Sequence, residues 1–111
     1  MRRFLLAFLP VLIACAGQFP DHVELTPEAQ NVDTLSEPPS PDAYKEVGRV
    51  VGVGAGTDVD SATEVAKNDL RNKAAALGAS LVTIDENTGA PIPLTKKLKV
   101  ELKGRAYKPV D

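Results

Sequence analysis

The feature that most constrains the fold is a strict alternation of apolar and charged side chains near the C-terminus, over residues 97–107. The apolar or small positions are Leu98, Val100, Leu102, Gly104 and Ala106, and the charged positions are Lys97, Lys99, Glu101, Lys103 and Arg105. Successive side chains of a β-strand point to opposite faces, so this period of two predicts a strand with one buried and one hydrated face. A second layer is needed to cover the apolar face.

An amphipathic helix is predicted to supply that layer. Ser61 and Glu64 have the spacing of a capping box, and Asp58 places negative charge near the positive end of the helix dipole. The helix is expected to continue to about Leu77, where Gly78 supplies a left-handed C-terminal cap. The face expected to pack on the sheet consists of Thr63, Ala66, Leu70, Ala74 and Leu77, flanked by Ala62 and Lys73.

The remaining elements complete a small α+β domain. Residues 44–53 are rich in β-branched side chains and run into the repeat Gly52, Gly54 and Gly56, which predicts a strand that ends in a flexible turn. Residues 81–84 predict a second strand, and residues 87–95, which contain two prolines, predict a loop. The order strand, helix, strand, strand therefore predicts two layers, with one helix on a three- to four-stranded open sheet.

The first residues match a secretory leader. Arg2 and Arg3 precede an apolar run over residues 4–14. As a helix this run would span only about 16 Å, too short for a hydrocarbon core of ~30 Å, whereas a positive start and a short apolar run are typical of a signal peptide. The run ends in Leu12-Ile13-Ala14-Cys15, which resembles the lipobox of bacterial lipoproteins. That resemblance implies removal of residues 1–14 and attachment of a diacylglyceryl group and an N-acyl chain to Cys15.

The lipobox resemblance also implies a location. Several acyl chains together hold a protein stably on a bilayer. Ala16 stands where lipoproteins of the inner membrane usually have Asp, so the resemblance implies the outer membrane of a Gram-negative cell, facing the periplasm. In the alternative interpretation, Cys15 is merely a residue near an ordinary cleavage site.

Composition divides the mature chain into a lipidated, acidic tether at residues 15–43 and a domain at residues 44–111. Residues 16–43 contain six acidic side chains, no Lys or Arg, and five of the nine prolines. Such a composition buries too little apolar surface to offset the entropy of ordering the chain, which predicts flexibility. Within it, residues 30–35 are a candidate for an additional N-terminal edge strand, with Val32 and Leu35 as its apolar side chains.

The helix region carries a family resemblance. Residues 66–79, with the sequence AKNDLRNKAAALGA, followed by Leu81 and Val82, resemble the signature of small proteobacterial lipoproteins that contain a domain of unknown function. Residues 47–107 are more distantly similar to the outer-membrane lipoprotein that senses envelope stress for the Rcs phosphorelay. That sensor relies on internal disulfides, whereas this chain has no cysteine after Cys15, which puts a disulfide-dependent signalling role in doubt.

Two surfaces are candidates for binding. The side of the predicted helix opposite the core is small and neutral, and consists of Val65, Asn68, Asn72, Ala75 and Ala76. It is either a docking surface for an envelope protein or a face that is simply exposed or packed by the tether.

The second surface is the charged face of the last strand, with Lys97, Lys99, Lys103 and Arg105, joined by Arg49 from the neighbouring strand. Three interpretations of this face are open. Its charges would attract anionic glycans or lipid headgroups, or they would protect a sheet edge from aggregation, or they would bind the acidic tether.

The sequence offers little for catalysis or cofactor binding. The glycine repeat lacks the further residues that nucleotide loops require, and the one histidine, His22, lies in the tether. The net charge of −2 gives no basic footprint for nucleic acid. We therefore expect a protein that is not an enzyme and that binds no cofactor, metal or nucleic acid. We expect an envelope lipoprotein whose domain acts as an interaction or stress-sensing module. The alternative is a module that binds an anionic envelope polymer, lipopolysaccharide or peptidoglycan, through the basic last strand.

Overall fold

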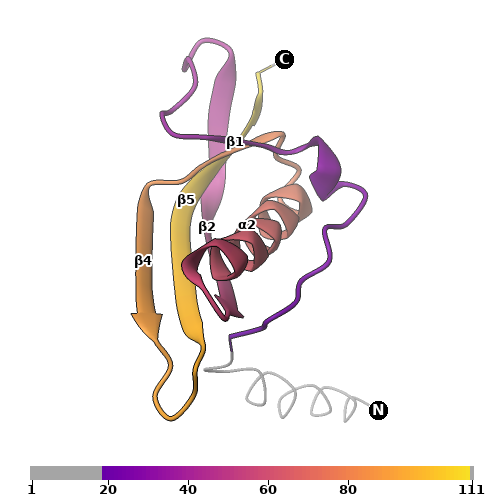
Figure 1. Cartoon of the computed structure of the whole chain (residues 1–111). Coiled ribbons are helices and arrows are strands. Elements are labelled where there is room, and N and C mark those ends of the chain that lie inside the picture. Colours follow the sequence, from indigo (N-terminus) through magenta and orange to yellow (C-terminus); the bar gives the residue numbers. More distant parts are fainter. Residues whose placement is uncertain (1–18, 111) are drawn as a thin grey trace, which may run out of the picture.

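The structure is a computed structural model that describes residues 19–110 (Figure 1). The predicted signal peptide and Cys15 lie outside these residues. In chain order the elements are a 3-10 turn η2 (Ala29–Asn31), strands β1 (Asp33–Leu35) and β2 (Tyr44–Gly56), helix α2 (Val59–Ala76), and strands β3 (Leu81–Thr83), β4 (Glu86–Pro91) and β5 (Leu98–Pro109).

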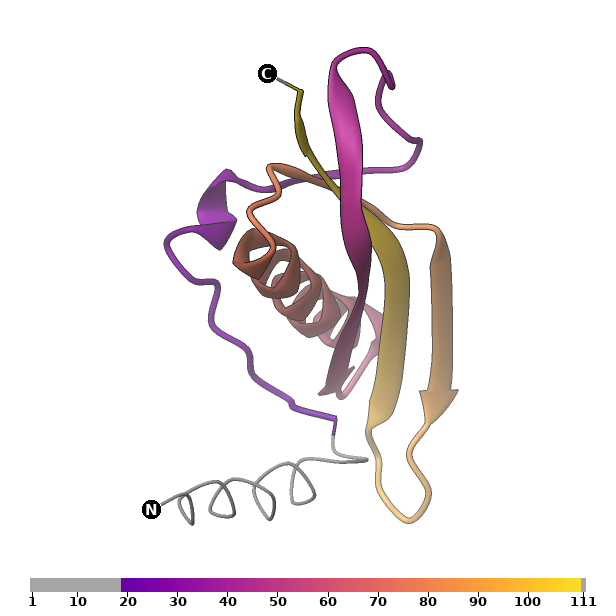
Figure 2. The same ribbon diagram turned by 180° about the vertical axis from the view of Figure 1, so that it is seen from behind.

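Strand β5 is the centre of a five-stranded mixed sheet with the order β1-β3-β5-β2, and β4 also pairs with β5. On one side β5 pairs with β2 along its whole length. On its other side β3 and β4 pair with successive parts of it, and β1 adds to β3 in parallel. Helix α2 covers one face of this sheet (Figures 1 and 2). The predicted α+β class, with one helix on an open sheet, is confirmed, and the sheet has more strands than predicted.

The alternation in the last strand is confirmed. Val100, Leu102 and Ala106 are buried beneath α2, whereas Lys103 between them is exposed. On α2 the buried residues recur every four positions, at Ala62, Ala66, Leu70 and Ala74, and all of them lie in the core. The core therefore lies between one face of β2 and β5 and one stripe of the helix.

The helix lies close to the sheet because β2 presents glycine beneath it. A Cβ built on Gly52 would lie 2.3 Å from the carbonyl oxygen of Ala66, and one on Gly54 would lie 2.5 Å from the amide nitrogen of Ala66. The predicted flexible turn is wrong, since β2 continues through Gly56 and, among the described glycines, only Gly78 has a positive φ. These glycines are needed for close approach of the backbones rather than for an unusual φ.

The N-terminus of the helix is capped three residues earlier than predicted. Asp58 is the N-cap, and its Oδ1 accepts hydrogen bonds from the amide of Ser61 at 2.8 Å and from the Ser61 hydroxyl at 2.6 Å. These bonds lower the pKa of Asp58. The capping box at Ser61 was wrong because Ser61 lies within the first turn and serves as donor to the true cap.

The C-terminal cap is confirmed at Gly78, whose φ is +81°. Its amide donates to the carbonyl of Ala75, and the amide of Ala79 donates to the carbonyl of Ala74, which is the hydrogen-bond pattern of a Schellman motif. Leu77, predicted to be in the core, is 44% exposed because it is the C-cap residue. No helix within residues 19–110 has the length and hydrophobicity needed to cross a bilayer.

Two segments predicted to be irregular are ordered. Residues 86–91 form β4 rather than the start of a loop, held by pairing with residues 98–103 of β5. Residues 19–35, which we call the N-terminal arm, pack on the domain instead of forming a flexible tether. Ala29 and Val32 are 0% and 1% exposed. The folded unit therefore extends to Phe19, well before the predicted boundary. Of the candidate strand at residues 30–35, only Asp33–Leu35 is a strand, β1, whereas Gln30 and Asn31 belong to the 3-10 turn η2.

Gly52→Ala is expected to lower the free energy of unfolding by about 2 kcal/mol or more, because the added methyl group overlaps helix backbone that cannot rotate away. Gly89→Ala on β4 is the matched control, since the nearest atom to its Cβ is 3.5 Å away, and its effect should stay within ~0.5 kcal/mol. Urea unfolding followed by circular dichroism measures both. Equal effects would contradict close backbone packing.

Candidate functional site

A charged hollow of about 590 Å³ lies on the sheet face opposite α2, beside the step from β3 to β4. The charged side chains that line it are Arg49, Asp85, Glu86, Lys103 and Arg105, and the N-terminal part of the chain contributes Ser36 and Pro38. Three cations and two carboxylates therefore face one small space. The sequence predicted the cations as a group but did not place the carboxylates among them.

The connection between β3 and β4 is held in place by contacts that involve Gly104 and Thr83. The carbonyl oxygen of Thr83 passes directly over Gly104, where any Cβ would overlap it. The Thr83 hydroxyl is fully buried and accepts a hydrogen bond of 3.0 Å from the amide of Arg105. After this step, the amide of Asp85 donates to the carbonyl of Lys103 at 2.7 Å. These backbone contacts fix the position of Asp85 relative to β5.

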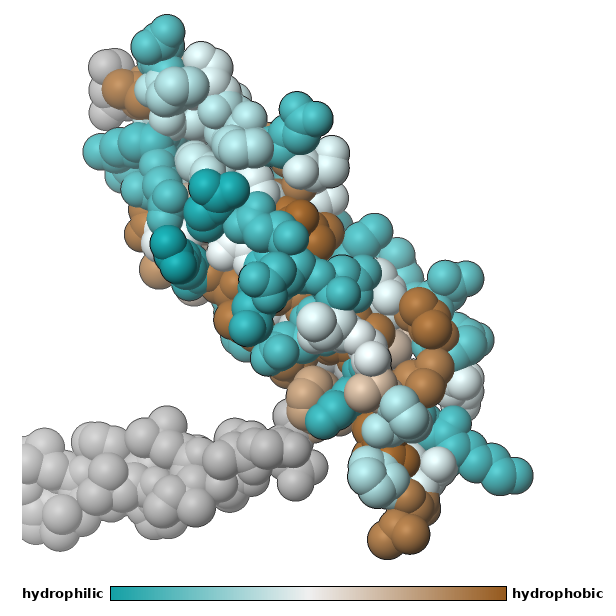
Figure 3. All heavy atoms as spheres, turned by 90° about the vertical axis from the view of Figure 1, so that its left-hand side faces the viewer, coloured by the Kyte–Doolittle hydropathy of each residue, from teal (hydrophilic) through white to brown (hydrophobic). Residues whose placement is uncertain are grey.

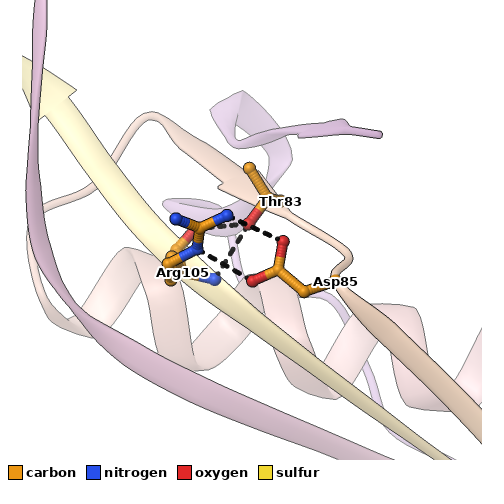
Figure 4. Close-up of polar contacts among 3 residues, drawn as sticks. All are labelled: Thr83, Asp85 and Arg105. Carbon is orange, nitrogen blue, oxygen red and sulfur yellow. Dashed lines mark hydrogen bonds and ion pairs between the residues drawn. The ribbon is translucent and has the colours of Figure 1, made fainter. Parts of the chain in front are cut away.

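Asp85 and Arg105 form a bidentate ion pair at this position (Figure 4). Arg105 Nε lies 2.9 Å from Asp85 Oδ2, and Arg105 Nη2 lies 3.2 Å from Asp85 Oδ1. The hydrogen bonds from Arg105 hold the pKa of the Asp85 carboxyl below its usual range, and the carboxylate in turn raises the pKa of Arg105. Asp85 is thus held as a carboxylate.

The predicted basic face is assembled by the fold, but most of its charges are already paired. Arg49 lies opposite Arg105 in the β2–β5 pairing. The other contacts are Lys97 with Asp21 at 2.7 Å, Lys99 over the Phe19 ring at 5.0 Å, Lys103 with Glu86 at 3.9 Å, and Arg105 with Asp85. The Lys97 hydrogen bond also lowers the pKa of Asp21. The alternative in which the acidic N-terminal segment binds this face is therefore observed at Lys97.

The predicted neutral helix face is covered by the N-terminal arm. Asn72 Oδ1 accepts from the amide of Thr26 at 2.9 Å, and its Nδ2 donates to the carbonyl of Glu24 at 2.8 Å. Asn68 Nδ2 donates to the carbonyl of Val23 at 3.0 Å. Val65 and Ala75 are half-buried, and Ala76 is exposed. The structure favours the interpretation in which the chain itself packs this face, because the amides that a partner would use already bind the arm.

Further contacts hold the arm and close the edge of the sheet. Arg71 donates to the carbonyls of Val32 and Gln30, at 2.9 and 3.3 Å. Three backbone groups on the outer edge of β2 form hydrogen bonds with helix side chains or with the arm. There Asp69 accepts from the amide of Val53, Lys73 donates to the carbonyl of Val51, and the carbonyl of Pro20 accepts from the amide of Ala55. These contacts, which sequence reasoning missed, protect the exposed edge strand from pairing with another chain.

Comparison with known proteins leaves the family open. No protein-family model matches the sequence, and no curated protein matches it either. The resemblance based on residues 66–79 stays a prediction. Within residues 19–110, no cluster of three or more His, Cys, Asp or Glu side chains is positioned to hold a metal ion.

Asp85→Asn should change how stability depends on pH. Because the folded-state pKa of Asp85 lies below its reference value of 3.8, its ion pair stabilises the fold above that pH and is lost as the pH falls through the lowered pKa. The difference in unfolding free energy between wild type and variant should therefore be largest near neutral pH and shrink in acid. Urea titrations at a series of pH values, with the exposed Asp42→Asn as control, measure it. A pH-independent difference would be evidence against this pairing.

Asn72→Ala should loosen the N-terminal arm. It removes two hydrogen bonds to the arm backbone, so amide exchange in residues 19–32 should accelerate about tenfold. Hydrogen exchange with mass spectrometry measures this, and Asn87→Ala, an exposed amide on β4, is the control. If the arm exchanges at the same rate in both variants, Asn72 does not hold it.

Proposed function

We propose that this protein is a bacterial envelope lipoprotein, anchored to the periplasmic face of the outer membrane through acylated Cys15, whose α+β domain acts by binding rather than catalysis. The proposal rests on the lipobox-like sequence at residues 12–15, which ends an apolar run too short to span a bilayer. The folded unit follows closely, since Phe19 already contacts β5.

A binding role is supported by the state of the ionisable groups in the hollow. A general acid or base works best with a pKa near the working pH, which for a carboxylate requires a raised pKa. The pKa of Asp85 is instead lowered by Arg105, and Glu86 lies beside Lys103. In the described part of the chain these groups form ion pairs that stabilise structure, which suits recognition better than proton transfer.

We place the proposed partner site at β4 and the hollow. The face with Asn68 and Asn72 is occupied by the arm. All six residues of β4 are exposed, and the hollow lies at its Glu86 end. A partner protein would therefore bind at β4 and the hollow, where strand addition and charge pairing are both available. Direct binding of an anionic polymer is less favoured, because four of the five cations proposed for it already contact an acid or an aromatic ring.

The lipid anchor is tested in cells fed with labelled palmitate. The wild type should incorporate the label and fractionate with the outer membrane, whereas Cys15→Ser should incorporate none and stay unprocessed. Ala16→Asp is the matched control, since it should keep the label and shift the protein to the inner membrane. Recovery of unlabelled wild type from the cytosol would refute the proposal.

A further inference from the structure

The loop between β4 and β5, residues 92–97, carries an unusual apolar tip. Leu94 is fully exposed and has a φ of +67°, a conformation in which glycine or asparagine is normally found. A bulky apolar side chain thus occupies a position that neither burial nor backbone preference favours. Exposed Pro93 precedes it, and Figure 3 shows hydrophobic residues gathered at this lower end of the molecule.

The loop is a defined turn. The amide of Ile92 donates to the carbonyl of Lys97 at 2.9 Å, and the hydroxyl of Thr95 donates to the carbonyl of Ile92 at 2.8 Å. The same hydroxyl accepts from the amide of Lys97 at 3.1 Å. These bonds hold Leu94 at the tip. Lys96, which is exposed, follows it in the loop, and the ammonium group of Lys97 pairs with Asp21.

The loop lies where the chain leaves the folded unit toward Cys15. Lys97 contacts Asp21, and Lys99 lies over the Phe19 ring, so the start of the arm is fixed beside the base of the loop. Both views of the ribbon show this end of the molecule opposite the C-terminus (Figures 1 and 2). Four residue steps separate Cys15 from Phe19, which limits the distance between their α-carbons to about 15 Å.

We propose that residues 92–97 form a membrane-contacting loop, in which Leu94 enters the lipid interface and the exposed Lys96 binds the headgroup phosphates. The inference rests on the lipid anchor proposed above. A bilayer that holds the acyl chains of Cys15 lies within reach of this end of the domain. An apolar tip next to an exposed lysine matches the chemistry of an anionic bilayer interface, where the apolar group is buried and the ammonium group remains among phosphates.

The membrane contact would set the orientation of the domain. The acyl chains already supply the attachment, so the loop adds a second point of contact that restricts tilting. β4 runs from the hollow to the loop, and its six residues span about 17 Å along the strand. The charged hollow would therefore face the periplasm at a fixed height above the headgroups, where a partner can reach it.

The absence of tryptophan from the sequence allows a direct test. The full chain carrying Leu94→Trp, acylated in cells and purified, is reconstituted into vesicles of phosphatidylethanolamine and phosphatidylglycerol. Val110→Trp, at an exposed position near the C-terminus, is the matched control. The tryptophan at position 94 should shift its emission to shorter wavelength and lose most of it when the acyl chains carry bromine. The tryptophan at position 110 should do neither.

Vesicle flotation, with circular dichroism to verify folding, separates the failure of this inference from the failure of the anchor. If both variants float and the tryptophan at position 94 stays as solvent-exposed as that at 110, the loop does not contact the membrane and the anchor stands. If neither variant floats, the lipid anchor is wrong and the loop inference falls with it.

Discussion

The contact between the backbone of α2 and the glycines of β2 is the interaction on which the rest of the structure depends. Gly52 and Gly54 have no side chain beneath the helix, and the backbone of Ala66 lies directly over them. The two layers therefore approach more closely than larger residues would allow. The resulting core is thin and built mainly from alanine and valine. A thin core buries little apolar surface, so a domain of this size needs further contacts to be stable.

The N-terminal arm supplies such contacts. It buries Ala29 and Val32 and adds β1 to the sheet. Because Asn72 and Arg71 bind its backbone rather than its side chains, an acidic, proline-containing sequence can be ordered without being apolar. Ordering the arm also brings the start of the folded unit close to Cys15. A lipid anchor would then hold one particular end of the domain against the bilayer, which a flexible tether would not do.

Periodic features could be predicted from the sequence, and features without a period could not. The alternation in β5 and the stripe on α2 each repeat over several turns or residues, so local geometry alone identifies them. The segment that forms β4 has low strand propensity and no alternation, and only its pairing with β5 makes it a strand. The cations of the candidate site were visible, but their pairing with Asp85, Glu86 and Asp21 was not.

The sequence by itself therefore determined the local structure: which face of β5 is buried, that a helix precedes Gly78 and how the helix ends there. The tertiary structure decided which polar groups bind one another. Asn72 and Thr26 are 46 residues apart in the chain, and Lys97 and Asp21 are 76 residues apart. The physical reason is that hydrogen bonds and ion pairs depend on distances of about 3 Å between groups, and these distances exist only once the helix and the sheet have packed.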